Sequence, residues 1–64
     1  MLTLLVFDRE ARKVLVLKEF KDEKEAFRRH MESAEKHDGN DAVTVELFTG
    51  GKKQLLDDFP WYAS

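Results

Sequence analysis

The chain has 64 residues, no cysteine and a formal net charge of −2. A chain of this length forms a single domain, residues 1–64, and buries only about 60% of the surface that its unfolded form exposes. The absence of cysteine excludes a disulfide framework and a thiolate metal site. Charged residues of both signs make up 38% of the chain, which is typical of a soluble surface and argues against a dedicated nucleic-acid-binding domain.

No signal peptide is apparent in the sequence. Its N-terminus lacks a basic segment followed by an apolar core and a small-residue cleavage site. The longest apolar run is far below the roughly 20 residues that a membrane span requires, and no Asn-x-Ser/Thr glycosylation sequon occurs. We therefore expect a cytoplasmic protein that has no membrane partner.

Two apolar runs near the N-terminus predict a pair of β-strands. Leu2–Phe7 is apolar almost throughout, which is typical of a central strand with both faces buried. A polar segment that begins at Asp8 then predicts a hairpin connection. Lys13–Phe20 predicts the second strand, and Lys18 and Glu19 near its end indicate an edge position, where charge discourages pairing with other chains.

A long helix follows and has clear signals at both ends. Asp22 is a favourable N-cap, and Glu25 stands three residues later, as in a capping box. Gly39 occupies a place where a glycine commonly stops a helix. The apolar residues of the helix recur at a spacing that predicts one narrow stripe: Ala26, Phe27, Met31 and Ala34.

Beyond the helix, Ala42–Thr49 alternates in polarity and predicts a third strand. A Gly-Gly pair then breaks the strand. The next segment, Lys52–Phe59, fits either a short helix or a fourth strand that is reached through a glycine hairpin. Two aspartates near its end have poor strand propensity. We therefore favour the short helix, which ends before Pro60 because the residue preceding a proline avoids the α region.

The order of these elements limits the topology of the sheet. A short connection makes the first two strands antiparallel, and the helical crossover makes the third strand parallel to the second. The most apolar strand belongs in the middle, which gives the strand order 2-1-3. We therefore predict an α+β fold of ββαβ order with a small, mainly antiparallel three-stranded sheet. One long helix covers one face, and a C-terminal short helix or fourth strand covers the other.

The predicted sheet is apolar on both faces, whereas one helix covers only one of them. With a regular pleat, five large apolar residues share the second face: Leu5, Phe7, Leu15, Leu17 and Phe48. Leaving all five exposed forgoes about 8–15 kcal/mol, which exceeds the total stability of about 3–10 kcal/mol expected at this length. The face must therefore be covered, either by the C-terminal segment or by a partner such as a second copy in a two-fold dimer.

The C-terminal aromatic residues are the first candidate for a functional surface. Phe59, Trp61 and Tyr62 either plug the second face of the sheet or recognise a protein partner, since Trp and Tyr are favoured at binding hot spots. With Leu5 and Leu17 of the sheet, they form the predicted interaction surface. The two roles are compatible, because the outer edge of a plug also serves as a contact surface.

The segment between the third strand and the last helix is the second candidate. Gly50 and Gly51 lead toward a helix N-terminus, where free backbone N–H groups together with Lys52 and Lys53 would hold a phosphate or carboxylate. The full P-loop spacing is missing. A flexible turn with solvated lysines is therefore the simpler interpretation.

No catalytic, cofactor or metal constellation is evident in the sequence. His30 lies at the edge of the apolar stripe, and His37 is roughly 10 Å farther along the helix axis, too far for both to bind one metal ion. Ser33 and Lys36 match a Ser-x-x-Lys pair, but the companion motifs of acyl-transferring enzymes are missing. We therefore predict no enzymatic activity, no cofactor and no bound metal.

The functional prediction follows from these candidates. The excess of apolar sheet surface and the terminal aromatic residues favour a protein-interaction module or homodimer. The alternative is a nucleic-acid or anion-binding accessory domain that uses Lys52, Lys53 and the helix arginines Arg28 and Arg29. Acidic residues accompany these cations along the helix, so a nucleic-acid partner is the less favoured of the two.

Overall fold

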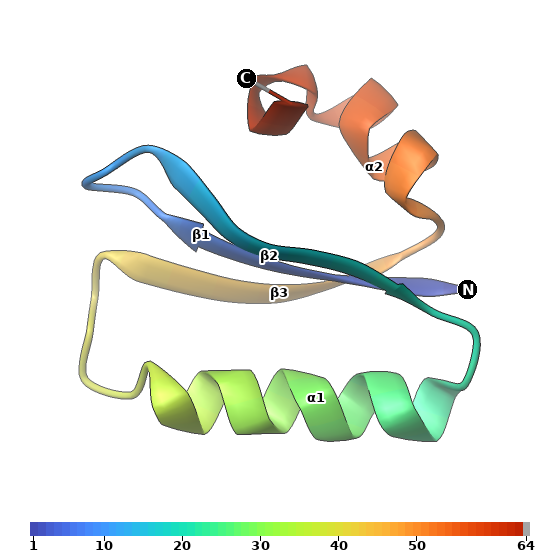
Figure 1. Cartoon of the computed structure of the whole chain (residues 1–64), viewed down its shortest axis with the longest axis horizontal. Coiled ribbons are helices and arrows are strands. Elements are labelled where there is room, and N and C mark those ends of the chain that lie inside the picture. Colours follow the sequence, from blue (N-terminus) through green and yellow to red (C-terminus); the bar gives the residue numbers. More distant parts are fainter. Residues whose placement is uncertain (64) are drawn as a thin grey trace.

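The computed structural model describes residues 1–63. Along the chain it forms β1 (Leu2–Asp8), β2 (Lys13–Phe20), α1 (Glu23–Lys36), β3 (Val43–Thr49), α2 (Lys52–Asp58) and the 3-10 helix η1 (Pro60–Ala63). The strands form one sheet in the order β2-β1-β3, with β1 antiparallel to both neighbours. Figure 1 shows α1 along one face of this sheet and the C-terminal helices over the other. The predicted α+β fold and strand order are confirmed.

The central strand β1 is buried on both faces. All of its residues from Leu2 to Val6 are buried, and Val6 has no exposed surface. On the α1 side, alternate residues of this strand form the main core with Phe20 and Ala26. A continuously apolar strand takes the central position because it loses the most free energy when either face meets water.

A β-bulge in β2 changes which of its residues reach each face. Val6 pairs with Val16, but the next residue, Phe7, pairs with Val14, so Leu15 has no partner in the ladder. Val14 therefore shares the second face with Phe7, and Leu15 is 42% exposed. The regular pleat predicted for this strand is wrong at this point, because one extra residue reverses the alternation on one side of it.

Helix α1 begins where the sequence predicts. The Asp22 carboxylate accepts the Lys24 N–H at 3.0 Å, as an N-cap does. At the other end the cap is His37, whose N–H donates to the Ser33 carbonyl at 3.1 Å. Gly39 lies two residues beyond that cap with a φ of +83°, so this glycine turns the connection that leads to β3.

The glycine pair after β3 leads into a helix and not into a fourth strand. Gly50 has a φ of +139°, and its carbonyl accepts the Thr3 hydroxyl at 2.8 Å. A Cβ atom at this position would lie 2.9 Å from the Phe48 ring, so the turn requires glycine. The short helix favoured from the sequence is confirmed as α2.

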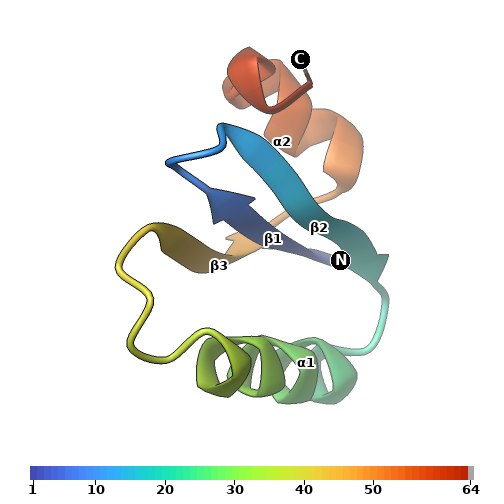
Figure 2. The same ribbon diagram turned by 60° about the vertical axis from the view of Figure 1, so that its left-hand side comes forward.

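The C-terminal segment packs on the second face of the sheet, as Figure 2 shows. Leu55 of α2 is only 2% exposed. The centroid of the Tyr62 ring lies 5.0 Å from that of Phe7, and the Phe59 centroid lies 6.2 Å from that of Phe48, both edge to face. These contacts bury aromatic surface against the sheet. The predicted covering of this face by the chain's own C-terminal segment is therefore confirmed.

Candidate functional site: the surface beside the open edge of β3

Several large apolar side chains remain exposed after folding. On α1, Phe27 is 54% and Met31 is 63% exposed, and in η1 Trp61 is 60% exposed. Single exposed apolar residues are common on monomeric proteins, whereas contiguous apolar surfaces mark contact sites. The neighbours of these residues therefore decide which of them belongs to a functional surface.

Helix α1 points only one member of its predicted apolar stripe, Ala26, at the sheet. The residues that recur along its most buried face are mainly polar: Ala26, His30, Ser33 and His37. Ala26 is fully buried, and the other three are half buried. At about 100° per residue, Phe27 and Met31 lie about a quarter to a third of a turn away from this face. Apart from Ala26, the stripe predicted from the sequence therefore faces sideways, toward the edge of β3.

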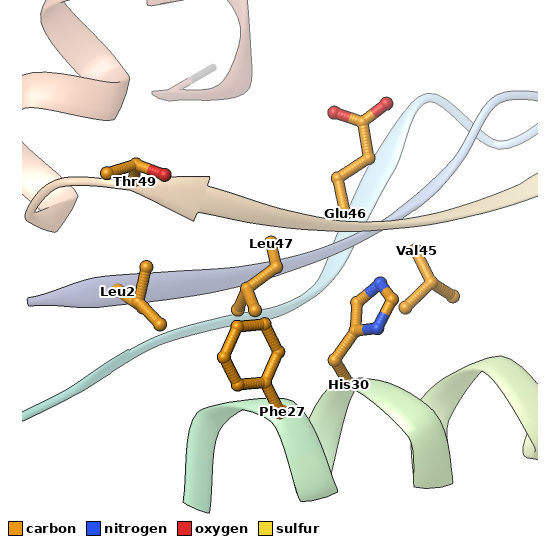
Figure 3. Close-up of a pocket in the computed structure, with 7 residues that line it drawn as sticks. All are labelled: Leu2, Phe27, His30, Val45, Glu46, Leu47 and Thr49. Carbon is orange, nitrogen blue, oxygen red and sulfur yellow. The ribbon is translucent and has the colours of Figure 1, made fainter. Parts of the chain in front are cut away.

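A groove of about 600 Å³ lies between this side of α1 and β3. Figure 3 shows Phe27 beside Leu47 and the His30 ring beside Val45, while Glu46, which also lines the groove, extends its side chain on the side of β3 opposite to α1. Three apolar side chains line the groove, namely Phe27, Val45 and Leu47, and the exposed Met31 follows Phe27 by one helical turn on the same side of α1. We call these four side chains the β3-edge surface.

The outer edge of β3 carries backbone groups with no partner strand. The Arg9 N–H donates to the Ala42 carbonyl at 2.8 Å, and the Gly50 N–H donates to the Met1 carbonyl at 3.0 Å. In an antiparallel ladder the bonded pairs alternate, so every second residue from Ala42 to Gly50 bonds β1. The N–H and C=O groups of the residues between them point away from β1: Val43, Val45, Leu47 and Thr49.

The two outer strands differ in how strongly their charges discourage pairing with another strand. β2 carries exposed Lys13, Lys18 and Glu19 as well as the bulge at Leu15. β3 carries a single charged residue, Glu46. Charges and bulges both discourage pairing with further strands. Sequence reasoning missed the β3-edge surface, although the unequal charge of the two outer strands was a signal for it.

The aromatic surface predicted from the sequence is divided between interior and exterior. Leu5 is 2% exposed and lies against Leu55 and the C-terminal rings, while Leu17 and Tyr62 are half buried. Trp61 remains on the outside, and Phe59, which packs on Phe48 with one side, keeps 37% of its surface exposed; the two ring centroids are 5.5 Å apart. Leu5 is therefore part of the interior, and contact with a partner through the outer rings stays a prediction.

The predicted anion contacts adjoin acidic groups of the chain itself. The backbone N–H of Lys52 donates to Glu19 Oε2 at 3.0 Å, so a carboxylate already occupies the N-terminus of α2. Lys52 and Lys53 line a shallow groove that also contains Asp57. Anion binding by this segment, with Gly50 and Gly51, stays a prediction, and a bound anion would compete with Glu19.

The helix arginines lie among carboxylates. Arg29 lies on the β2 side of α1, in the same groove as Glu32. Glu32 forms an ion pair with Arg28 at 3.8 Å. Within residues 1–63, no three side chains of the metal-binding types converge on one point. The same part of the chain contains no helix with the length and apolar character that crossing a membrane requires.

The chain matches no family model, no curated protein and no solved structure. Its function must therefore be inferred from the geometry of its own surfaces. The β3-edge surface combines three features of a contact site: exposed apolar side chains, unpaired backbone groups and little charge.

Proposed function

We propose that this chain is a non-enzymatic protein-interaction module that binds its partner through the β3-edge surface. The observation that carries the proposal is that Phe27 is exposed in the groove beside the open edge of β3, with Met31 exposed one helical turn farther along the same side of α1. A partner strand added to β3 would satisfy the free N–H and C=O groups. The two helix side chains would then lie above the added strand and provide an apolar contact.

The magnitudes support binding of this kind. Covering a Phe or Met side chain completely contributes about 1.5–3 kcal/mol relative to exposure, and Phe27 and Met31 each retain more than half of that surface. Each new strand hydrogen bond adds about 0.5–1.5 kcal/mol. Aromatic residues and methionine are also enriched at protein interfaces.

A nucleic-acid or anion-binding role has weaker support. It would use exposed Lys52 and Lys53 with the arginines of α1, but Glu19 occupies the helix N-terminus and Glu32 pairs with Arg28. A gel-shift series at decreasing salt tests this role, because phosphate contacts strengthen steeply as salt falls. Lack of binding at the lowest salt would exclude it.

A photo-crosslinking amino acid at Phe27 tests the proposed interaction in the cells that normally produce the chain. The matched control carries the same probe at Arg29, on the β2 side of the same helix. We expect discrete crosslinked protein products from the probe at Phe27 and not from the probe at Arg29. A folded chain that gives no such product at Phe27 would contradict the proposal.

A further inference from the structure

We infer that the partner of the β3-edge surface is a second copy of this chain, an inference that rests on the proposed function. The two β3 strands pair antiparallel across a two-fold axis at Val45, which joins the two sheets into one. The axis is perpendicular to the joined sheet, so both copies of α1 lie on one face and both C-terminal segments lie on the other.

The hydrogen-bonding pattern of β3 permits this pairing. The N–H and C=O groups of Val43, Val45 and Leu47 point outward, away from β1. With the axis at Val45, the two copies of Val45 form one hydrogen-bonded pair, and Val43 of each copy lies opposite Leu47 of the other. The free backbone groups of Val45 and Leu47 thus find their partners in the second copy. The Val43 N–H donates to the Asn40 carbonyl at 3.2 Å in the single chain, so it would exchange this bond for one to Leu47 of the second copy.

Glu46 decides between this register and the neighbouring one. An axis at Glu46 would place two carboxylates directly opposite each other, with Cβ atoms about 4.5–5.5 Å apart, where like charges are destabilising. An axis at Val45 instead places Glu46 opposite the uncharged Thr44 of the second copy, whose hydroxyl donates to its own Phe7 carbonyl at 3.4 Å, so no two carboxylates meet. The register with Val45 on the axis is therefore favoured.

The position of α1 over the sheet fits the same axis. The helix contacts β1 and β3 alike and β2 less, so it lies above the space between β1 and β3. Neighbouring strands are about 4.8 Å apart, which places the helix about 5 Å from an axis just beyond β3. The two copies of α1 would then lie about 10 Å apart, close to the separation of about 8–10 Å at which helices pack.

The sideways stripe of α1 is complementary to itself across this axis. Phe27 lies at the level of Leu47, and His30 lies at the level of Val45, so the axis passes near the middle of the stripe. In the resulting antiparallel helix pair, Phe27 of one copy faces Ala34 of the other, a large residue against a small one. Met31 packs near its counterpart at the centre.

The exposed area of the single chain agrees with a missing partner. The chain exposes 4736 Å², about 500 Å² more than the ~4,250 Å² expected for a compact monomer of 7.5 kDa. A small but stable interface buries about 600 Å² on each partner. Pairing through β3 and α1 would therefore bring the exposed area close to the ordinary value.

Sedimentation equilibrium of the purified chain between about 1 µM and 1 mM tests the inference. We expect the average mass to rise from the 7.5 kDa of one chain toward twice that value. Phe27→Lys should move the association to concentrations at least about tenfold higher, a change of about 1.4 kcal/mol. The control Val16→Lys, at an exposed apolar residue of the other outer strand, should leave the association unchanged.

A chain that stays monomeric throughout this range would overturn the inference. So would a dimer that Val16→Lys disrupts and Phe27→Lys does not. A monomeric chain whose probe at Phe27 crosslinks to a different protein would reject self-pairing and leave the proposed function standing.

Cysteine substitutions test the register, because the chain has no cysteine of its own. With the axis at Val45, Thr44 and Glu46 of opposite copies form a non-hydrogen-bonded pair with Cα atoms about 4.5 Å apart, which suits a disulfide. A mixture of Thr44→Cys and Glu46→Cys chains should form a mixed disulfide, whereas each variant alone should crosslink poorly. Efficient self-crosslinking of Glu46→Cys would overturn the register, and a dimer without the mixed disulfide would overturn pairing through β3.

Discussion

The two faces of the sheet are covered in different ways. On one face the short helix α2 and the turn η1 pack Leu55, Phe59 and Tyr62 against the sheet and bury Leu5. On the other face α1 is twice as long as α2, yet each helix has a single buried residue, the small Ala26 in α1 and the large Leu55 in α2. The contrast shows that the length of a covering element matters less than the direction in which its apolar residues point.

The exposed apolar surface therefore lies on the α1 side of the sheet in the structure, whereas the sequence suggests that it would lie on the opposite face. The sequence indicates that the second face of the sheet needs a cover, and the C-terminal segment supplies it. From the sequence, the sheet face under the helix needs no further cover, because a capped amphipathic helix is available for it. In the structure this side exposes Phe27 beside an open strand edge and Met31 one helical turn farther along α1.

The largest expected difference in stability is between alanine substitutions of two phenylalanines on the helix side. Phe20 is 5% exposed, whereas Phe27 is 54% exposed. We expect Phe20→Ala to lower the free energy of unfolding by about 3–5 kcal/mol and Phe27→Ala to change it by less than about 0.5 kcal/mol. Urea unfolding of the monomeric chain measures both, with Phe20→Leu as a milder variant if Phe20→Ala does not fold. Similar losses for both alanine variants would place Phe27 in the core.

On the C-terminal side, Leu55 should be the residue on which the cover depends. It is 2% exposed, and its neighbour Leu56 is half buried. We expect Leu55→Ala to cost about 2–5 kcal/mol because it leaves a cavity under the rings, and Leu56→Ala to cost less. Thermal unfolding followed by Trp61 fluorescence checks the order of the two variants. The reverse order would mean that α2 packs through its other side.

Alanine substitutions at the two glycines with positive φ should differ in their cost in stability, because only one of these glycines is crowded by a neighbouring side chain. Gly39 and Gly50 have φ values of +83° and +139°. A Cβ atom would have nothing within 4 Å at Gly39, whereas at Gly50 it would lie 2.9 Å from the Phe48 ring. We expect Gly50→Ala to cost about 1–3 kcal/mol more than Gly39→Ala, the typical cost of overpacking. Chemical unfolding measures this difference, and equal costs would remove the role of the Phe48 contact.

The smallest effect concerns the N-cap of α1. Asp22 accepts the Lys24 N–H at 3.0 Å, so Asp22→Ala should lower the free energy of unfolding by about 1 kcal/mol, whereas Asp22→Asn should preserve the cap. Urea unfolding of the two variants provides the measurement. If the alanine and asparagine variants had the same free energy of unfolding, the N-cap would contribute nothing to stability.

Much of the fold is predictable because local signals agree with it. The apolar run of β1 predicts a central strand, and Asp22 predicts the start of α1. The glycine pair predicts the end of β3, and the aspartates Asp57 and Asp58 favour the helix α2 over a fourth strand. The bulge at Leu15 is not predictable in this way, because a regular strand places apolar residues on both faces equally well. The hydrogen bond from the Lys52 N–H to Glu19 is not predictable from the sequence either, since 33 positions separate the two residues and only the fold brings them together.

The candidate site was predicted less well than the fold. The sequence draws attention to Phe59, Trp61 and Tyr62, because aromatic residues at the end of a chain are conspicuous. It also identifies the apolar stripe of α1 without indicating where the stripe points. The rotation of the helix depends on which residues fit closest to the sheet, and the small Ala26 takes that place while Phe27 does not.

By itself the sequence determined the elements, their order and the need to cover a sheet that is apolar on both faces, because periodicity, capping and apolar content act over short distances. Only the tertiary structure decided that the C-terminal segment covers one face and that Phe27 and Met31 lie beside the free edge of β3. These outcomes depend on how close two elements pack and how one is rotated against the other, which no local pattern in the chain encodes.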